Sequence, residues 1–328
     1  MEAALHSMTD RDVRVCEVGL RDGLQSIPEF FPTVDKVAWL AAEAAAGVPE
    51  IEVTSLVPAK VLPQFADAEE VVASALTVPG LHVTVLVPNL RGAERGIELG
   101  AHTLDFVMSV SRTHSRQNVR REPEESVADF ERIVTLCREL PPDDRPRLKG
   151  GLSTALGCSY EGRVAIDDVR RYAAALAEAG ADELLVADTV GYADPVQVAA
   201  VFGAVRDEVG TLPVGAHFHD TRGLGLANVA AALDCGVRAF DASLGGLGGC
   251  PFAPGATGNI VMEDLVFMLD SMGLRTGVDL DALLAVRSIP ASRLAAQELH
   301  GAVARAGLPV NYMPAAERAR AATTTRET

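Results

Sequence analysis

Two histidines separated by a single residue close an apolar run, PVGAHFHD (213–220). Side chains two positions apart on a strand share a face, so the imidazoles of His217 and His219 are expected to point the same way. The segment LGGLGGCPFAPGATGN (244–259), which carries a lone Cys250 and Asn259, follows soon after. A segment with so many glycines is unsuited to a packed core. These features predict a metal site with a thiol beside it.

Polar residues also lie in or just after other strand-like runs. LRDGLQ (20–25) supplies Arg21 and Asp22, EIEVTSL (50–56) contains Glu52, and ELLVAD (183–188) ends in Asp188. An unpaired carboxylate inside an apolar strand is costly, so Glu52 is expected to have a buried partner such as Arg21. Asp22 and Asp188 each have a structural alternative, because an aspartate at a strand end often caps the following helix.

Two imidazoles, one carboxylate and one amide oxygen leave two positions open around an octahedral ion. This mixed nitrogen and oxygen set suits Mg²⁺ or Mn²⁺ and tolerates Co²⁺ or Zn²⁺. Two histidines with one carboxylate also occur in non-haem iron oxygenases, so that class stays open. An ion with two open positions can chelate a substrate hydroxyl and a carbonyl or carboxylate oxygen. Such a site suits carbon–carbon cleavage beside an alkoxide, with Arg21 balancing enolate charge and a loop thiol delivering a proton.

Eight apolar runs are spaced on average roughly 30 residues apart, the size of a strand–helix unit. They are residues 13–20, 50–56, 81–88, 103–110, 147–156, 183–188, 213–220 and 239–246. The pattern predicts an α/β fold, a (β/α)8 TIM barrel, in which active groups gather at the carboxyl ends of the strands. An open doubly wound sheet is the second interpretation, although no GxGxxG follows the first run.

The sequence divides into a polar leader (1–12), a barrel (13–275), extra C-terminal helices packed on it (276–310) and a disordered tail (311–328). Thr33 is expected to cap the first long helix, which Gly47 follows. Further glycines stand where later helices should end, at Gly100, Gly180, Gly210, Gly236 and Gly273.

Composition excludes several classes of partner. The 328 residues carry a formal charge of -16, which argues against nucleic acid and anionic membranes. No apolar run reaches the roughly 18 residues that span a bilayer, and the first residues resemble neither a signal nor a transit peptide. Five scattered cysteines form no disulfide framework. We expect a cytoplasmic enzyme that forms a homo-oligomer.

The chain resembles the 3-hydroxy-3-methylglutaryl-CoA lyase family of metal-dependent barrels. The resemblance covers about residues 13–275, and its glycine-rich segment is highly specific. The matching segments, in family order, are EVGLRDGLQ (17–25), IEVTSLV (51–57), PNLRG (88–92), ALGCSYEG (155–162), ADTVG (187–191), HFHDTRGLGLAN (217–228) and GGLGGCPFAPGATGN (245–259).

The resemblance implies a retro-Claisen cleavage of a 3-hydroxy-3-alkylglutaryl-CoA into acetyl-CoA and a 3-keto acid. By that likeness the metal ligands are Asp22, His217, His219 and Asn259. Arg21 would steady the enolate, Cys250 would be the loop acid, and Asp188 and Glu52 would assist proton transfer from the hydroxyl. Gln25 and Asn118 would face the substrate. Glu263, one helical turn after Asn259, would hold the ligands from behind.

The chain departs from the family pattern after Gln25. Ser26-Ile27-Pro28 stands where the family has Asn-Glu-Lys, which removes a cation expected near the substrate or the CoA phosphates. Arg112, Arg116 and Arg120 can compensate or can form a solvated face. The reaction type is therefore better fixed than the acyl group, and a longer 3-alkyl branch stays open.

Two other catalytic functions remain as alternatives, and a non-catalytic or scaffold relative is disfavoured because no proposed ligand is missing. A condensing enzyme of the same superfamily, which adds an acyl-CoA enolate to a 2-keto acid, shares the R-D-G and H-x-H motifs, but the cysteine-bearing loop favours cleavage. A metal-dependent hydrolase is the other alternative. In barrel hydrolases the H-x-H pair usually belongs to the first strand, whereas here it ends the seventh.

Overall fold

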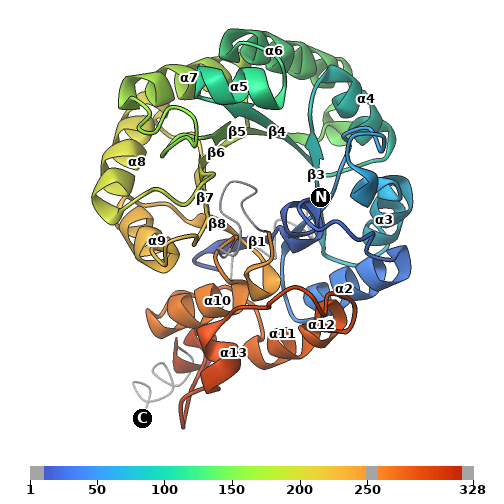
Figure 1. The fold of residues 1–328 in the computed structure, drawn as a ribbon, viewed down its shortest axis with the longest axis vertical. Coiled ribbons are helices and arrows are strands. Elements are labelled where there is room, and N and C mark those ends of the chain that lie inside the picture. The colour runs from blue at the N-terminus through green and yellow to red at the C-terminus, as the bar shows by residue number, and fades with distance from the viewer. Residues whose placement is uncertain (1–10, 249–257, 320–328) are drawn as a thin grey trace.

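Eight parallel strands close into a barrel in the computed structural model, with the last strand paired to the first (Figure 1). The structure describes residues 11–248 and 258–319. The strands are β1 Arg14–Glu17, β2 Glu50–Ser55, β3 His82–Val87, β4 Thr103–Ser109, β5 Arg147–Ser153, β6 Glu183–Asp188, β7 Val214–Phe218 and β8 Ala239–Ala242. The predicted TIM barrel is confirmed, and the open sheet is wrong because β8 closes on β1.

Charged residues fill the interior of the barrel. Lys149 Nζ on β5 lies 3.2 Å from Glu50 Oε1 on β2, and Arg14 on β1 pairs with both Glu50 and Glu183. Since β2 and β5 are not neighbours, the Lys149–Glu50 pair crosses the interior. Removing one partner of such a buried pair typically costs about 3–5 kcal/mol. The interior is therefore a charged network that lies beneath the carboxyl ends of the strands.

Helices surround the barrel, and most of them end at the expected glycines. The helices after the strands are α2 Thr33–Ala45, α3 Ala68–Ala75, α4 Leu90–Glu98, α5 Arg112–Asn118, α6 Pro123–Glu139, α7 Ile166–Ala179, α8 Pro195–Val209, α9 Gly225–Asp234 and α10 Met262–Ser271. Shorter turns are η1 Gly19–Gly23, η2 Pro63–Phe65, η3 Pro142–Asp144 and η4 Leu244–Gly246. Each of the six predicted terminal glycines has a positive φ, a conformation that most other residues avoid.

The predicted cap at Thr33 is wrong. Thr33 is the first residue of α2, Pro32 precedes it, and no side chain caps the helix. The Thr33 hydroxyl instead donates to Asp67 Oδ2 over 2.8 Å and ties α2 to the start of α3.

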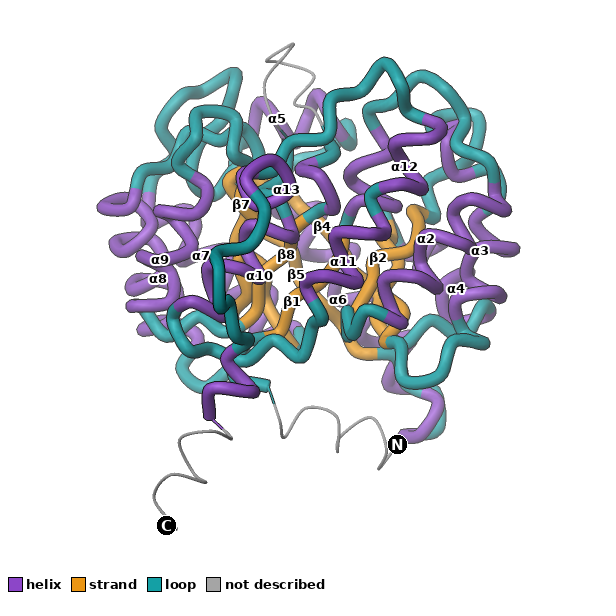
Figure 2. Tube along the Cα trace, turned by 90° about the horizontal axis from the view of Figure 1, so that it is seen from below, coloured by secondary structure: helices purple, strands orange, loops and turns teal. Residues whose placement is uncertain are grey.

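The C-terminal helices lie against α2 and α10 on one side of the barrel (Figures 1 and 2). They are α11 Leu280–Val286, α12 Ser288–Arg293 and α13 Ala302–Ala306. The chain beyond α13 also packs, since Tyr312 stacks on Phe267 and its hydroxyl donates to Asp270. A helical turn follows at 315–319. Half-buried Tyr312 thus makes tertiary contacts within residues 311–328, the segment predicted as a disordered tail.

Within residues 11–248 and 258–319, none of the helices combines the length and the apolar character needed to cross a bilayer.

Candidate metal and active site

Asp22, His217 and His219 form one cluster at the carboxyl end of the barrel. One ligand atom from each side chain lies within 4.8 Å of the others. His217 is the last residue of β7 that points into the barrel, and the side chains of His217 and His219 are both more than nine-tenths buried. Asp22 comes from η1, a single π-helical turn in which the Val18 carbonyl accepts from the Asp22 and Gly23 amides. Such turns recur at functional sites because they widen the backbone and re-aim side chains.

Asn259 reaches the same cluster from the other end of the barrel sequence. Its backbone pairs with that of His219, and its Nδ2 donates to Asp22 Oδ2 over 2.7 Å and to the Leu247 carbonyl over 3.0 Å. These two acceptors fix the orientation of the amide. The structure thus brings together all four residues that the sequence predicts as ligands.

The cluster fits a divalent cation. Asn259 Oδ1 and His219 Nδ1 are buried and have no hydrogen-bond partner among the described residues. An unpartnered buried polar atom costs about 1–3 kcal/mol, and a cation would satisfy acceptors of this kind. The donors are nitrogen and oxygen without thiolate, the set that Mg²⁺ and Mn²⁺ accept.

Arg21 points from η1 between two carboxylates. Its Nε donates to Glu52 Oε2 over 2.7 Å, and Nη1 donates to Asp22 Oδ1 over 2.7 Å. The buried partner predicted for Glu52 is confirmed. Burial alone would raise the pKa of Asp22, but the Arg21 guanidinium holds that pKa well below its usual range. Asp22 is therefore available as an ionised ligand, with a fixed positive charge beside it.

Asp241 is a site residue that the sequence interpretation missed. It lies on β8 in register with His217 on β7, and its Oδ2 is 3.1 Å from His217 Nδ1. The signal was present, because a carboxylate inside the buried run AFDAS calls for a partner by the same reasoning that pairs Glu52 with Arg21. The identity of that partner depends on strand register, which the sequence alone leaves open.

Asp188 does not join the cluster through a hydrogen bond. Its two oxygens accept from the Tyr192 amide over 2.9 Å and the Ala193 amide over 3.0 Å. Burial raises the pKa of Asp188. These contacts hold the loop after β6 in place. They favour a structural role for Asp188, although its carboxylate stabilises a loop and does not cap the following helix.

The remaining predicted residues lie in different places. Gln25 is half-buried just after η1, and Asn118 is exposed at the end of α5. Within the described chain, neither side chain hydrogen-bonds to the Asp22–His217–His219 cluster. Cys250 lies outside the described residues.

Glu263 supports η4, the turn with which the glycine-rich segment begins. Its carboxylate accepts from the Gly245 amide over 3.0 Å and pairs with Arg287. The amide of the preceding residue, Leu244, donates to the carboxylate of Glu17 on β1 over 3.0 Å. Glu263 was predicted to stand behind the ligands, and its contacts place it behind η4 rather than against the Asn259 side chain.

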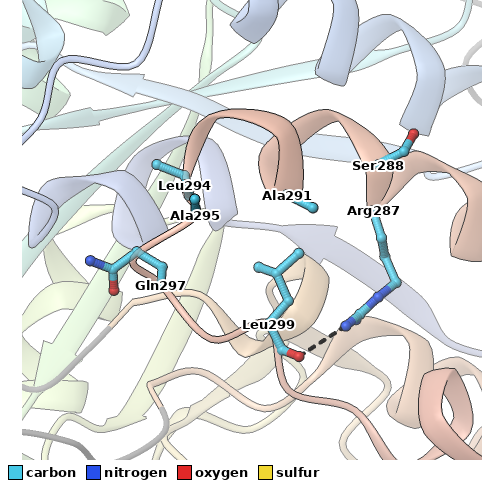
Figure 3. A pocket seen from close by; sticks show the side chains of 7 residues that line it. All are labelled: Arg287, Ser288, Ala291, Leu294, Ala295, Gln297 and Leu299. Atoms are coloured by element: carbon cyan, nitrogen blue, oxygen red, sulfur yellow. Dashed lines mark hydrogen bonds between the residues drawn. The ribbon is translucent and has the colours of Figure 1, made fainter.

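A hollow of about 360 Å³ lies beside α12, between Leu294, Leu299 and Arg287 (Figure 3). Arg287 is its one ionisable lining residue, and its guanidinium already donates to the Leu299 and His300 carbonyls and pairs with Glu263. The hollow contains none of the clustered residues. The candidate for chemistry is therefore the mouth of the barrel.

Known proteins resemble this chain over most of its length. It is 40% identical over 275 residues to hydroxymethylglutaryl-CoA lyase YngG of Bacillus subtilis, covering 84% of this chain and 91% of that protein. It is 38% identical over 283 residues to (R)-citramalyl-CoA lyase of Chloroflexus aurantiacus, covering 83% and 88% respectively.

Solved structures agree. An HMG-CoA lyase from Acinetobacter baumannii, in complex with coenzyme A and 3-methylmalate, matches with a TM-score of 0.84 and 39% identity over 92% of this chain and 97% of that chain. The carboxyl transferase domain of Rhizobium etli pyruvate carboxylase matches with a TM-score of 0.66 at 18% identity, over 99% of this chain and 55% of that chain, and shares the fold alone. Residues 12–289 match the family model described as HMGL-like, and the chain belongs to that family.

Proposed function

We propose that the chain is a divalent-metal-dependent carbon–carbon lyase that cleaves 3-hydroxy-3-methylglutaryl-CoA, or a 3-alkyl homologue, to acetyl-CoA and acetoacetate or the matching 3-keto acid. The observation that carries this proposal is the meeting of Asp22 and Asn259 beside His217 and His219, with Arg21 next to them. The names of the relatives support the same reaction class.

Asp22, His217, His219 and Asn259 would hold the ion, with Mg²⁺ or Mn²⁺ the expected metal. A bound divalent ion would polarise the tertiary hydroxyl and the neighbouring oxygen of the substrate. Arg21 then places its guanidinium where negative charge develops on the thioester enolate, and Glu52 orients that guanidinium. As the bond between the two carbons breaks, its electron pair becomes the enolate.

Two proton transfers complete the reaction. The hydroxyl proton must leave before the carbon–carbon bond breaks, and Glu52 is the retained candidate because its Oε1 has no partner within the described ranges. Asp188 is omitted from this role, since both of its oxygens accept backbone hydrogen bonds. Cys250 would then protonate the enolate carbon to release acetyl-CoA.

The acyl group is the least determined part of the proposal. Ile27, within the departing Ser26-Ile27-Pro28 segment, is buried, and its carbonyl accepts from Gln64. Two of the three arginines expected to compensate for the lost cation are themselves paired, since Arg112 and Arg116 contact Glu122, whereas Arg120 is exposed. Binding of the CoA phosphates must therefore rest on other cations or on rearrangement of these exposed pairs.

A panel of thioesters tests the function. The purified protein with Mg²⁺ or Mn²⁺ is expected to release acetyl-CoA from 3-hydroxy-3-methylglutaryl-CoA, a longer 3-alkyl homologue or citramalyl-CoA, as read by mass spectrometry. Release of free CoA with an intact acyl acid would indicate a hydrolase instead. The condensing alternative would be indicated if the metal-bound protein cleaved none of these thioesters but joined acetyl-CoA to a 2-keto acid.

We also infer a cytoplasmic location and a homo-oligomer. Among the relatives, one rat lyase is named cytoplasmic and another mitochondrial. Light scattering coupled to size-exclusion chromatography measures the assembly directly, and a mass equal to one chain would contradict the oligomer.

A further inference from the structure

The two histidines of the cluster differ in what holds them. His217 Nδ1 lies 3.1 Å from Asp241 Oδ2, and the side chains are 8% and 5% exposed. His219 Nδ1 has no partner among the residues that the structure describes. His217 is therefore held at Nδ1 by a carboxylate from the next strand, whereas His219 approaches a carboxylate through Nε2, which lies 3.6 Å from Asp22 Oδ2.

The contact with Asp241 determines which ring nitrogen of His217 can bind a cation. An ionised carboxylate only accepts hydrogen bonds, so the hydrogen of a neutral imidazole must stand on Nδ1. Nε2 then keeps its lone pair and can act as a ligand. A carboxylate on the far nitrogen of a metal-bound histidine also fixes the ring plane and raises ligand basicity.

A buried cation lies in the charged interior of the barrel. Lys149 on β5 is 3% exposed. Its closest carboxylate contacts are Glu50 Oε1 at 3.2 Å and Asp105 Oδ2 at 3.9 Å. These two carboxylates thus share one ammonium group inside the barrel, where an unpaired charge would be strongly disfavoured.

We propose that Asp241 is a positioning residue of the metal site, which holds His217 as the Nδ1–H tautomer. The inference rests on the proposed metal site and is independent of the acyl substrate. It assigns the charged interior of the barrel a role in the chemistry above it, in addition to its role in folding.

Substitution of Asp241 should change the tautomer before it changes anything else. In Asp241→Asn the new amide can donate to Nδ1 and so favour the Nε2–H tautomer, which has no lone pair toward the cation. In Asp241→Ala the restraint is lost altogether. Loss of such a supporting carboxylate typically weakens metal binding about 10–100-fold.

Asp105→Asn is the matched control. Asp105 is a buried carboxylate like Asp241 and lies beside Lys149, but no contact joins it to His217 in the described part of the chain. It should leave the tautomer of His217 unchanged and the Mn²⁺ affinity within about 2-fold.

The test uses the full chain labelled with ¹⁵N-histidine, with the His217 signals identified by comparison with His217→Gln. Imidazole nitrogen shifts of the metal-free protein report the tautomer, and electron paramagnetic resonance of added Mn²⁺ reports affinity. The proposal expects Nδ1–H in the unsubstituted protein, Nε2–H or a mixture in Asp241→Asn, and a 10–100-fold rise in the Mn²⁺ Kd of both Asp241 variants.

Nε2–H in the unsubstituted protein would overturn the proposal even if every variant failed to fold. Unchanged tautomer and unchanged affinity in Asp241→Ala would overturn it as well. Failure of the lyase assay would leave both readouts intact, since neither uses a substrate. A protein that shows Nδ1–H but binds no Mn²⁺ would overturn the metal role of Asp241 together with the proposed metal site.

Discussion

Asn259 Nδ2 donates to Asp22 Oδ2 over 2.7 Å, although 237 positions separate the two residues. The contact exists because β8 pairs with β1, which places the turn after the first strand beside the chain after the last strand. Because Nδ2 makes this contact, Asn259 Oδ1 is left with no partner among the described residues. Closure of the barrel therefore completes the proposed ligand set.

Asn259→Ala should weaken Mn²⁺ binding and turnover together. The variant removes one ligand and leaves Asp22 without its amide donor, so a loss of about 10-fold or more in metal affinity is expected. Isothermal titration with Mn²⁺ measures it. Affinity within 2-fold of the unsubstituted protein would show that the amide oxygen does not bind the ion.

Arg21→Met should lower turnover far more than it changes metal affinity. The guanidinium is proposed to act on charge that develops as the bond breaks, and loss of such a donor costs roughly 10²–10³-fold in kcat. The variant also leaves buried Glu52 without its partner, so the melting temperature should fall. Steady-state kinetics and Mn²⁺ titration separate the two effects, and a raised KM with unchanged kcat would assign Arg21 to substrate binding alone.

Removal of divalent metal should stop turnover reversibly. A chelator is expected to abolish acetyl-CoA release, and added Mg²⁺ or Mn²⁺ should restore it. An ion at 100 times its Kd stabilises the fold by about 2.7 kcal/mol, and this raises the melting temperature. Asp22→Ala is the control that should show no such rise, and metal stabilisation that survives in it would place the ion elsewhere.

Cys250→Ser tests the loop acid. Metal affinity should stay unchanged, whereas turnover should fall by about 10²–10⁴-fold, the usual contribution of a positioned general acid. Cys235→Ser is the matched control, since Cys235 is a partly exposed cysteine on the barrel flank and should keep full activity. Equal kinetics for the two variants would remove Cys250 from the mechanism.

The buried carboxyl group of Glu17 should make the free energy of unfolding fall as pH rises. Its carboxylate accepts from the Gly19 amide over 2.6 Å and the Leu244 amide over 3.0 Å, beside Glu43 and Glu263. Burial raises the pKa of Glu17 to about 8. The unfolded value is about 4.3, so between these values the folded chain binds more protons and the free energy of unfolding decreases with increasing pH.

Urea denaturation between pH 5 and 8.5 measures this dependence. Glu17→Gln should flatten the decline in the free energy of unfolding, although the neighbouring carboxyl of Glu43 preserves part of it. Glu69→Gln, at an exposed pair with Arg95, should leave the decline unchanged. A steeper or identical decline in Glu17→Gln would contradict the assignment.

The sequence predicts the barrel because eight apolar runs recur at the spacing of a strand–helix unit. It predicts the Arg21–Glu52 pair because a carboxylate in a buried strand needs a partner, and the structure confirms it. It also predicts His217 and His219 on one face, since a strand alternates with a period of two.

Residues whose role depends on tertiary register were not predictable in the same way. Glu183 pairs across the interior with Arg14, so Asp188, five positions later on β6, falls on the opposite face. Because Asp188 lies on that face, its carboxylate contacts the Tyr192 and Ala193 amides of the loop after β6. Asp241 was missed because its partner depends on the alignment of β7 with β8. Tyr312 packs because α10 presents Phe267 and Asp270 to it, which composition does not reveal.

The most direct test of the account is anomalous diffraction from crystals soaked with Mn²⁺. We predict a single strong peak at the mouth of the barrel, about 2.0–2.3 Å from a carboxylate oxygen of Asp22, one nitrogen each of His217 and His219, and Oδ1 of Asn259. A peak that these four side chains do not share, or Asp22 and Asn259 turned away from the ion, would contradict it.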